Sequence, residues 1–196
     1  MFLPPVHAET DTAVLLQFIR ENPLGLLITG IKSSQNFLQC THVPFVLDTP
    51  EESTELAPKG RLRAHIAKKN PQVTAMIEGL ERKPSVLDIE DSLWQIDDLS
   101  QYMERSVMGY TGGKNPQPWT VSDAPEKYIE FMQRNIVGIE IRIEEIQGKF
   151  KMSQEMKPGD REGVVAGFAQ MGGETGEAIS RLVRQRGALH DLKTRK

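Results

Sequence analysis

The sequence contains a single cysteine, Cys40, among its 196 residues. One thiol excludes an intramolecular disulfide framework and is typical of a protein in a reducing compartment. Long apolar runs are also missing, and none approaches the ~20 residues that a membrane-spanning helix needs. The first residues show no basic stretch followed by an apolar one. We therefore expect no signal peptide and a cytoplasmic location, with the nucleus as an alternative.

Local signatures of the common catalytic families are missing too. The sequence has no Cys-x-x-Cys, His-Glu-x-x-His or Gly-x-Ser-x-Gly pattern and no phosphate loop ending in Gly-Lys-Ser/Thr. The glycine-rich run 109–114 is expected to follow a helix instead of a strand, which favours a flexible loop over a phosphate site. His7, His42, His65 and His190 are dispersed, without the local spacing of a metal site. His42 and His65 are each expected to be hydrogen-bonding strand residues, with a shared cleft as the alternative.

The overall charge excludes a strong general attraction to nucleic acid. Lysine and arginine number 24 against 27 acidic residues, and the net charge is −3. The stretch 181–196 differs, because it is strongly basic and Asp191 is its single acid. Its cations are Arg181, Arg184, Arg186, Lys193, Arg195 and Lys196. A solvated helix end is the simpler interpretation, and a contact with nucleic acid or an acidic partner is the alternative.

Apolar residues recur at helical spacing in several segments. The pair Thr10-Asp11 caps the first helix, and Asn22-Pro23 ends it. Asn70-Pro71 opens the second, whose apolar stripe is Val73, Met76, Ile77 and Leu80. The helices expected from this spacing cover residues 10–22, 70–80, 92–107, 123–132 and 160–196, and Gly172-Gly173 is expected to break the last of these into two.

Strands are expected where the apolar period is two or where β-branched residues gather. Polar residues at 32–36 predict a hairpin between the first two strands, and Pro44 predicts a sheet edge or a bulge. The region between 80 and 119 contributes no expected strand. The expected strands are 24–31, 37–47, 61–66, 136–144 and 149–153.

Strands joined by hairpins and long helical excursions predict an α+β fold built on a small antiparallel barrel. Because the central region adds no strand, an incomplete barrel with an open edge is the alternative to a closed one. The barrel domain is expected over 1–155 with a helical insertion at 70–135, followed by a helical extension at 156–196.

The expected strand 149–153 carries the most suggestive polar cluster. Alternation would send Lys149, Lys151 and Ser153 to one face and Phe150 and Met152 to the other. Two ammonium groups and a hydroxyl along one face would make an anion cradle. A solvated strand face is the alternative interpretation.

Several blocks of residues, spread over most of the chain, are distinctive. They include the opening Phe-Leu-Pro-Pro-Val-His, the Arg-Ala-His-Ile-Ala-Lys-Lys-Asn-Pro-Gln run and Gly-Lys-Phe-Lys-Met-Ser-Gln. These blocks resemble the PaiB-type family, and the resemblance is specific because they follow one another in the family's order. The matching blocks are 2–11, 23–29, 42–45, 63–72, 118–125, 136–141, 148–154 and 160–165.

The resemblance implies an FMN-binding split barrel, related to pyridoxamine-phosphate oxidases and flavin reductases and usually a dimer with FMN in the cleft between subunits. It implies an FMN-binding protein that acts as a weak flavin-dependent oxidoreductase. Bacterial members are described as negative transcriptional regulators, so a regulator acting on DNA is an alternative, and a non-catalytic dimerising relic is another. This chain looks more like the fungal branch. The residues implied to face the flavin are Thr41, His42, His65, Lys151, Ser153 and Gln154.

The chain departs from the family pattern in its centre. Between the helix that begins at Pro71 and the block around Trp119, the family has further strands and an aromatic-rich segment. Here Leu80 is followed almost directly by the helix expected from Ser92. The resemblance therefore implies that a central segment is missing, including residues expected to contact the flavin.

Overall fold

The computed structural model describes residues 2–49, 59–82, 87–90 and 93–194. The chain forms two compact units. The helical unit combines Met1–Leu15 with Ile146–Lys196, and the sheet unit is Leu16–Glu145. Their boundary falls inside helix α1 (Thr12–Glu21), which begins after Asp11 as expected because the Asp11 carboxylate accepts a hydrogen bond from Ala13 N. The division expected from the sequence, a barrel domain over residues 1–155 followed by a helical extension, stays a prediction.

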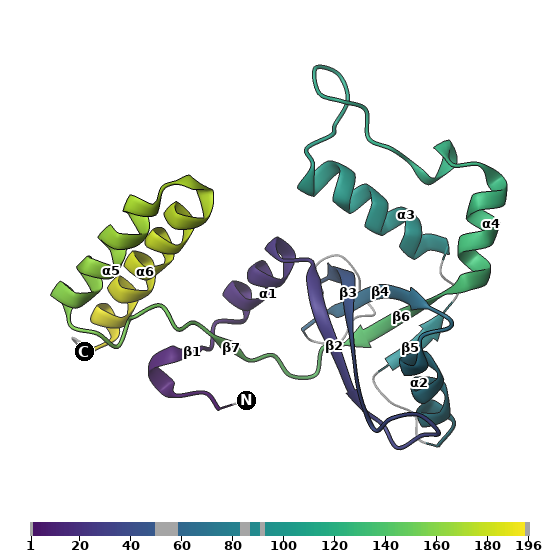
Figure 1. The fold of residues 1–196 in the computed structure, drawn as a ribbon, viewed down its shortest axis with the longest axis horizontal. Helices are drawn as coiled ribbons and strands as arrows, with labels where there is room; N and C mark the ends of the chain where they lie inside the picture. The colour runs from purple at the N-terminus through teal and green to yellow at the C-terminus, as the bar shows by residue number, and fades with distance from the viewer. Residues whose placement is uncertain (1, 50–58, 83–86, 91–92, 195–196) are drawn as a thin grey trace. The chain divides into compact units, whose positions relative to one another are not determined.

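An antiparallel sheet forms the centre of the sheet unit (Figure 1). Antiparallel pairing together with helices confirms the predicted α+β class. The sheet is not a closed barrel, because β2 and β5 remain its two edges among the described strands. Its strands, in spatial order, are β2 (Leu24–Gly30), β3 (Leu38–Asp48), β4 (Arg61–Ala67), β6 (Ile136–Arg142) and β5 (Leu87–Glu90).

The fifth strand differs from the one expected. Residues 87–90 form β5, which pairs with β6 from Leu87↔Ile141 to Glu90↔Gly138. The expectation that the region between 80 and 119 adds no strand was therefore wrong. A run of only four residues gives little periodicity, and its strand conformation depends on hydrogen bonds offered by β6.

Pro44 lies where one strand pairing gives way to another. Residues Leu38–Pro44 of β3 pair with β2, and Phe45–Asp48 pair with β4. Phe45 N donates to Pro23 O, so the nitrogen of Pro44 faces the β4 side, where it has no hydrogen to donate. The missing donor explains why the described β3–β4 ladder begins at Phe45.

Helix α2 (Pro71–Arg82) covers the middle of one sheet face. Its Val73 and Met76 are 2% and 1% exposed and pack with Ile66, Val137 and Ile139. The expected helix and two of its apolar positions are confirmed, whereas Ile77 is 44% exposed. Asn70 caps α2 as predicted, because its side-chain oxygen accepts from Gln72 N at 2.9 Å.

Gln72 is a polar residue inside this apolar contact and is fully buried. Its amide nitrogen donates to Leu27 O and Thr29 Oγ1, each at 3.1 Å. Its amide oxygen accepts from Thr41 Oγ1 at 2.6 Å. One side chain therefore ties α2 to both strands of the β2–β3 hairpin, and every polar atom of that amide is used.

The remaining helices of the sheet unit follow the periodicity of the sequence. Helix α3 (Leu93–Gln101) continues as π-helix over Tyr102–Val107, which matches the helix expected at 92–107 in its described part. A short 3₁₀ helix, Val121–Asp123, precedes α4 (Glu126–Asn135). The glycine-rich residues between these helices have no regular secondary structure.

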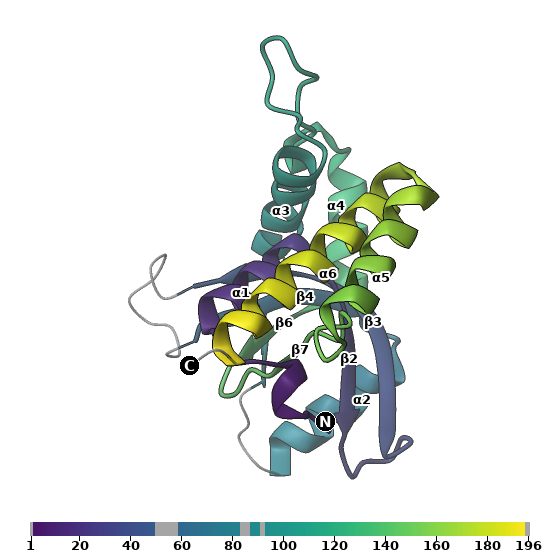
Figure 2. The ribbon, with the colours of Figure 1, turned by 90° about the vertical axis from the view of Figure 1, so that its left-hand side faces the viewer.

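The helical unit is built on a helix hairpin. Helices α5 (Pro158–Met171) and α6 (Gly173–Thr194) lie side by side in both views (Figures 1 and 2). Gly172, with φ at 67°, breaks the helix where the Gly-Gly pair predicted a break. Arg161 of α5 pairs with Asp191 of α6 and passes so close to Gly187 that a Cβ there would lie 2.3 Å from its Nε. A larger residue at 187 would therefore displace the Arg161 side chain.

The N-terminal part of the helical unit adds a small ladder. A 3₁₀ helix, Pro5–His7, leads into β1 (Ala8–Glu9), which pairs antiparallel with β7 (Gly148–Lys149). None of the helices, over the residues that the structure describes, is long and apolar enough to cross a membrane.

We expect Gln72→Ala to lower the free energy of unfolding by about 2 to 4 kcal/mol, because it leaves buried partners on β2 and β3 without hydrogen bonds. Urea denaturation followed by circular dichroism measures this change. Gln39→Ala is the matched control, since the Gln39 amide lies on the same hairpin but makes only an exposed 3.5 Å contact with Pro71 O. A loss for Gln72→Ala no larger than that for the control would contradict the proposed clamp.

Candidate functional site

The six residues implied by the resemblance divide between the two units. Thr41 and His42 lie on β3 and His65 lies on β4, all in the sheet unit. Lys151, Ser153 and Gln154 follow β7 in the helical unit. The structure therefore supplies two separate groups, each of which has its own surroundings.

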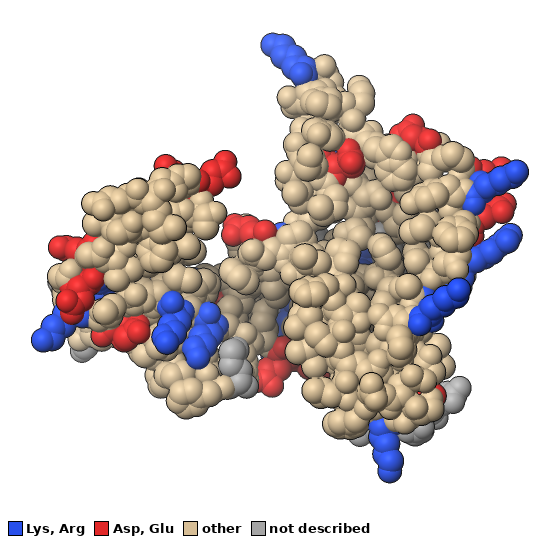
Figure 3. Space-filling view, in the orientation of Figure 1, with Lys and Arg blue, Asp and Glu red and all other residues tan. Residues whose placement is uncertain are grey.

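One face of the β2–β3 hairpin is exposed and apolar. Side chains alternate along both strands, and the register pairs Leu26 with His42 and Ile28 with Cys40 on the exposed side. We call this surface the hairpin face, and Figure 3 shows few charged side chains over the hairpin on the side that it displays. Its large apolar members are Leu24, Leu26, Ile28 and Leu38, which are between 50% and 67% exposed. Such a contiguous apolar strip is typical of a binding surface.

His42 and His65 share this side of the sheet. The β3–β4 register aligns Phe45 with Ala64, so counting back along β3 puts His42 diagonally across from His65. His42 is exposed, whereas His65 is partly buried. The predicted alternative of two histidines on one face is thus consistent with the register.

His65 carries an unused hydrogen-bonding atom. Its Nδ1 is buried and has no hydrogen-bond partner among the described residues. Burial lowers the pKa of His65 below its ordinary value, because the charged imidazolium loses solvation. The ring is therefore neutral near pH 7 and has one nitrogen that a bound molecule can satisfy.

Thr41 lies on the opposite side of β3 from His42. Its hydroxyl donates to Gln72 Oε1 at 2.6 Å and accepts from Asn70 Nδ2 at 3.0 Å. Both contacts join the hairpin to the start of α2. The structure thus brings His42 and His65 to one face and uses Thr41 in packing on the other.

The predicted strand over 149–153 was wrong. Strand β7 ends at Lys149, and Ser153 has φ at 58°, in the left-handed region. Gln154 explains the turn, because its side chain accepts from Met152 N at 2.6 Å and donates to Phe150 O and to Val6 O. These bonds replace a strand ladder with a local loop. The shared face expected for Lys149, Lys151 and Ser153 does not form, and Lys151 is exposed on this loop.

An ion-pair network next to His65 was missed by the sequence reasoning. Arg61 contacts Asp48 at 2.9 Å and Glu140 at 2.8 Å, while Arg63 bonds Asp48 at 2.6 Å and also Asp98. Burial alone would lower the pKa of each arginine, but the carboxylates raise it overall. The alternation of Arg61, Arg63 and His65 showed that these residues share a face, while their acidic partners come from distant segments.

The geometry fits a flat aromatic ligand better than a metal or a nucleophilic centre. The hairpin face offers apolar contact area, and His65 Nδ1 offers one buried hydrogen-bonding position. A flavin ring needs both, since its faces are apolar and its pyrimidine edge is polar. In the helical unit, Gln154 has its amide fully engaged, so Lys151 and Ser153 are the members of that group that remain for a ligand.

Comparison with known proteins agrees with this chemistry. The family model described as "Putative FMN-binding domain" matches residues 1–89 and 80–145, and the chain belongs to this family. An uncharacterized protein of Aspergillus fumigatus is 40% identical over 261 aligned positions, which cover 98% of this chain and 100% of the relative. An uncharacterized protein of Emericella nidulans is 38% identical over 256 positions, with 98% of this chain and 100% of the relative covered.

The lowered pKa of His65 predicts a pH-dependent contribution to stability. Below its ordinary pKa of about 6.5 the unfolded chain binds a proton that the folded chain does not, so this contribution is lost as the pH falls through that region. We expect His65→Gln to reduce the difference in unfolding free energy between about pH 7.5 and about pH 5.5. Urea denaturation at both pH values measures it.

His42→Gln is the matched control, because it removes an exposed ring from the same face. It should retain the pH dependence of the natural chain. An unchanged pH dependence in His65→Gln would show that His65 is not desolvated in the folded chain.

Proposed function

We propose that this member of the FMN-binding family binds FMN in its sheet unit, with the isoalloxazine ring against the hairpin face and its polar edge near His65. The observation that carries the proposal is the buried Nδ1 of His65, which has no partner among the described residues and lies beside an exposed apolar strip. A buried polar atom without a partner lowers stability by about 1 to 3 kcal/mol, so a ligand that satisfies it gains affinity.

The hairpin residues supply the complementary apolar contact. Leu26 and Ile28 project from β2 beside His42 and Cys40 of β3. These side chains would exclude water from one side of a planar ring, and the neutral imidazole of His65 would orient it. Bound FMN would supply redox chemistry, and a weak flavin-dependent oxidoreductase is the activity that we propose for the family fold. Lys151 and Ser153, which belong to the helical unit, remain proposed flavin contacts on the ground of the resemblance alone.

We propose that the chain forms a homodimer through the same surface. The four large apolar side chains of the hairpin face are exposed and adjacent, and a contact between two copies would remove them from water. The two copies would meet over part of this surface, and the flavin ring would lie against the rest of it. An assembly of this kind would enclose FMN more completely than one sheet face can.

A missing central segment is a further part of the proposal. The family model matches in two stretches that overlap at residues 80–89 instead of one continuous stretch. The alignment with the Aspergillus fumigatus relative runs over 261 positions, whereas this chain has 196 residues, so part of the relative has no counterpart here. The overlap points to the region after α2 as the place of the difference. FMN affinity would then depend more heavily on the hairpin face and His65.

The PaiB-like regulator alternative depends on the basic stretch 181–196. Within the described part of this stretch, Arg186 is paired with Glu9, and Asp191 is paired with Arg161. Arg186 is therefore used within the helical unit, which leaves fewer exposed cations for contacts with the DNA backbone. We place flavin binding ahead of this alternative and of a non-catalytic dimerising relic.

FMN added to the purified chain should shift the visible flavin band and quench flavin fluorescence at micromolar concentrations. His65→Leu should weaken binding about two- to tenfold, the equivalent of one neutral hydrogen bond. Tyr128→Leu, at an exposed ring of α4, is the control and should bind as the natural chain does. The absence of any flavin perturbation would refute FMN binding, and equal affinity in His65→Leu would refute the role of His65.

The natural chain should have the mass of a dimer in light scattering coupled to size-exclusion chromatography. Leu38→Lys should shift it toward the monomer, because it places a charge in the apolar contact. Phe131→Lys is the matched control, since Phe131 is 61% exposed on α4, away from the hairpin. A monomeric natural chain, or a Leu38→Lys variant that stays dimeric, would contradict this interface.

A further inference from the structure

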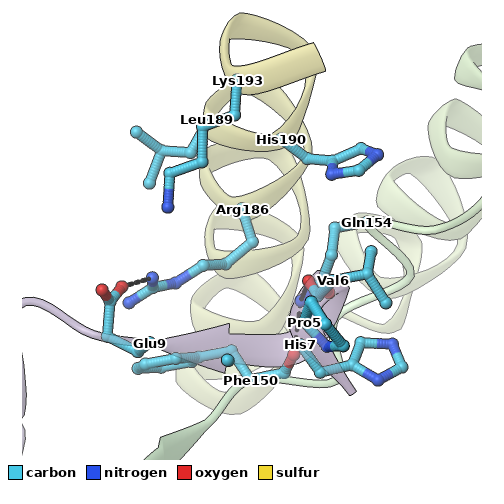
Figure 4. A pocket seen from close by; sticks show the side chains of 11 residues that line it. Pro5, Val6, His7, Glu9, Phe150, Gln154, Arg186, Leu189, His190 and Lys193 are labelled. Carbon is cyan, nitrogen blue, oxygen red and sulfur yellow. Dashed lines mark hydrogen bonds and ion pairs between the residues drawn. The ribbon is translucent and has the colours of Figure 1, made fainter.

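The helical unit contains a small polar cavity that the flavin proposal does not use. Its volume is about 70 Å³, and it lies between the N-terminal segment and α6 (Figure 4). This space admits a compact group of a few heavy atoms. The side chains that give the cavity its chemistry are His7, Glu9, Gln154, Arg186, His190 and Lys193.

One wall of the cavity is held by Arg186. Its guanidinium pairs with the carboxylate of Glu9 and lies 3.4 Å from the ring centroid of Phe150. The side chains of Arg186 and Glu9 are only 11% and 9% exposed. This pairing and stacking join α6 to the β1–β7 ladder, so the wall exists before any ligand binds.

The carboxylate of Glu9 is already satisfied. One oxygen accepts from Thr10 N and Asp11 N, each at 2.9 Å, and the other accepts from Arg186. Burial by itself would raise the pKa of Glu9, but these hydrogen bonds and the arginine charge lower it overall. Its negative charge is therefore balanced within the wall, and it opposes an incoming anion less than a free carboxylate would.

The α6 side of the cavity has further donors that are not used. His190 and Lys193 are three residues apart on α6 and so lie on the same side of the helix. Neither side chain has a hydrogen-bond or ion-pair partner among the described residues. Arg186 Nε is buried and likewise without a partner in the described part of the chain. Gln154 already donates to Val6 O and Phe150 O, so it stiffens the floor of the cavity.

We propose that this cavity binds a phosphate group. An ammonium and an imidazole on one helix face, beside a fixed guanidinium, supply several donors and a positive charge around a space of suitable size. Lysine is a common phosphate ligand, and histidine adds a donor in either of its protonation states. The group is either free orthophosphate or the terminal phosphate of a monoester, and the same donors recognise both.

Orthophosphate, titrated at constant ionic strength against chloride, should raise the midpoint of thermal unfolding of the full-length chain at millimolar concentrations. Lys193→Gln and His190→Gln should each weaken this effect at least threefold. Lys157→Gln, at an exposed lysine of the same unit outside the cavity, is the matched control and should respond as the natural chain does. All three positions are at least partly exposed, so circular dichroism should show the natural fold in each variant.

A further comparison separates the two sources of phosphate. If the cavity takes a monoester, glycerol phosphate should compete with orthophosphate in the natural chain, and glycerol should not. If it takes the free ion alone, neither compound competes. The proposal is overturned if phosphate stabilises no more than chloride does, or if Lys193→Gln responds as the natural chain does. None of these phosphate experiments contains FMN, so a negative result refutes the phosphate site without bearing on flavin binding.

Discussion

The pairing of β4 with β6 organises both faces of the sheet unit. It joins residues 61–67 to residues 136–142, which are far apart in the sequence, in one antiparallel register. On one face the register sets Ile66 and Ile139 beneath α2, where apolar burial stabilises the fold. On the other face it aligns Arg63 with Glu140 and His65 with Gly138. The core, the ion-pair network and the candidate histidine site all depend on this single alignment.

Two buried amide side chains, one in each unit, hold segments together that are distant in the sequence. Gln72 connects α2 to the β2–β3 hairpin, and Gln154 closes the loop that follows β7. Both side chains satisfy backbone or hydroxyl groups that would otherwise be buried without partners. The two cases differ in outcome. Gln72 supports the helix and strands expected from periodicity, whereas Gln154 competes with a strand and replaces it with a turn.

The two proposed binding regions make different physical demands. The hairpin face relies on apolar area and one neutral imidazole nitrogen, which suits a planar ring that is only partly enclosed. The cavity of the helical unit relies on the hydrogen-bond donors of Arg186, His190 and Lys193 around a small volume, which suits a compact anion. Arg186 shows why a count of basic residues is a weak guide to function. Its charge lies inside the unit and is balanced by Glu9.

The sequence alone determined the helices with strong apolar periodicity, the β2–β3 hairpin, and strands β4 and β6. These elements were predictable because their signals are local, from the Asn70 cap to the alternation of residues 136–142. Residue blocks in the family's order also predicted membership in an FMN-binding family, which the family model supports. His42 and His65 were candidates on the same grounds.

Only the tertiary structure decided that β5 pairs with β6, that the chain turns at Ser153, and that Thr41 and His65 have such different surroundings. Each of these features depends on a partner from another part of the chain: β6 for β5, Val6 O for Gln154, and Gln72 for Thr41. The cavity of the helical unit likewise joins residues 5–9 to residues 186–193. Hydrogen bonds and burial between distant segments leave no periodic trace in a sequence, so they become visible only once the chain is folded.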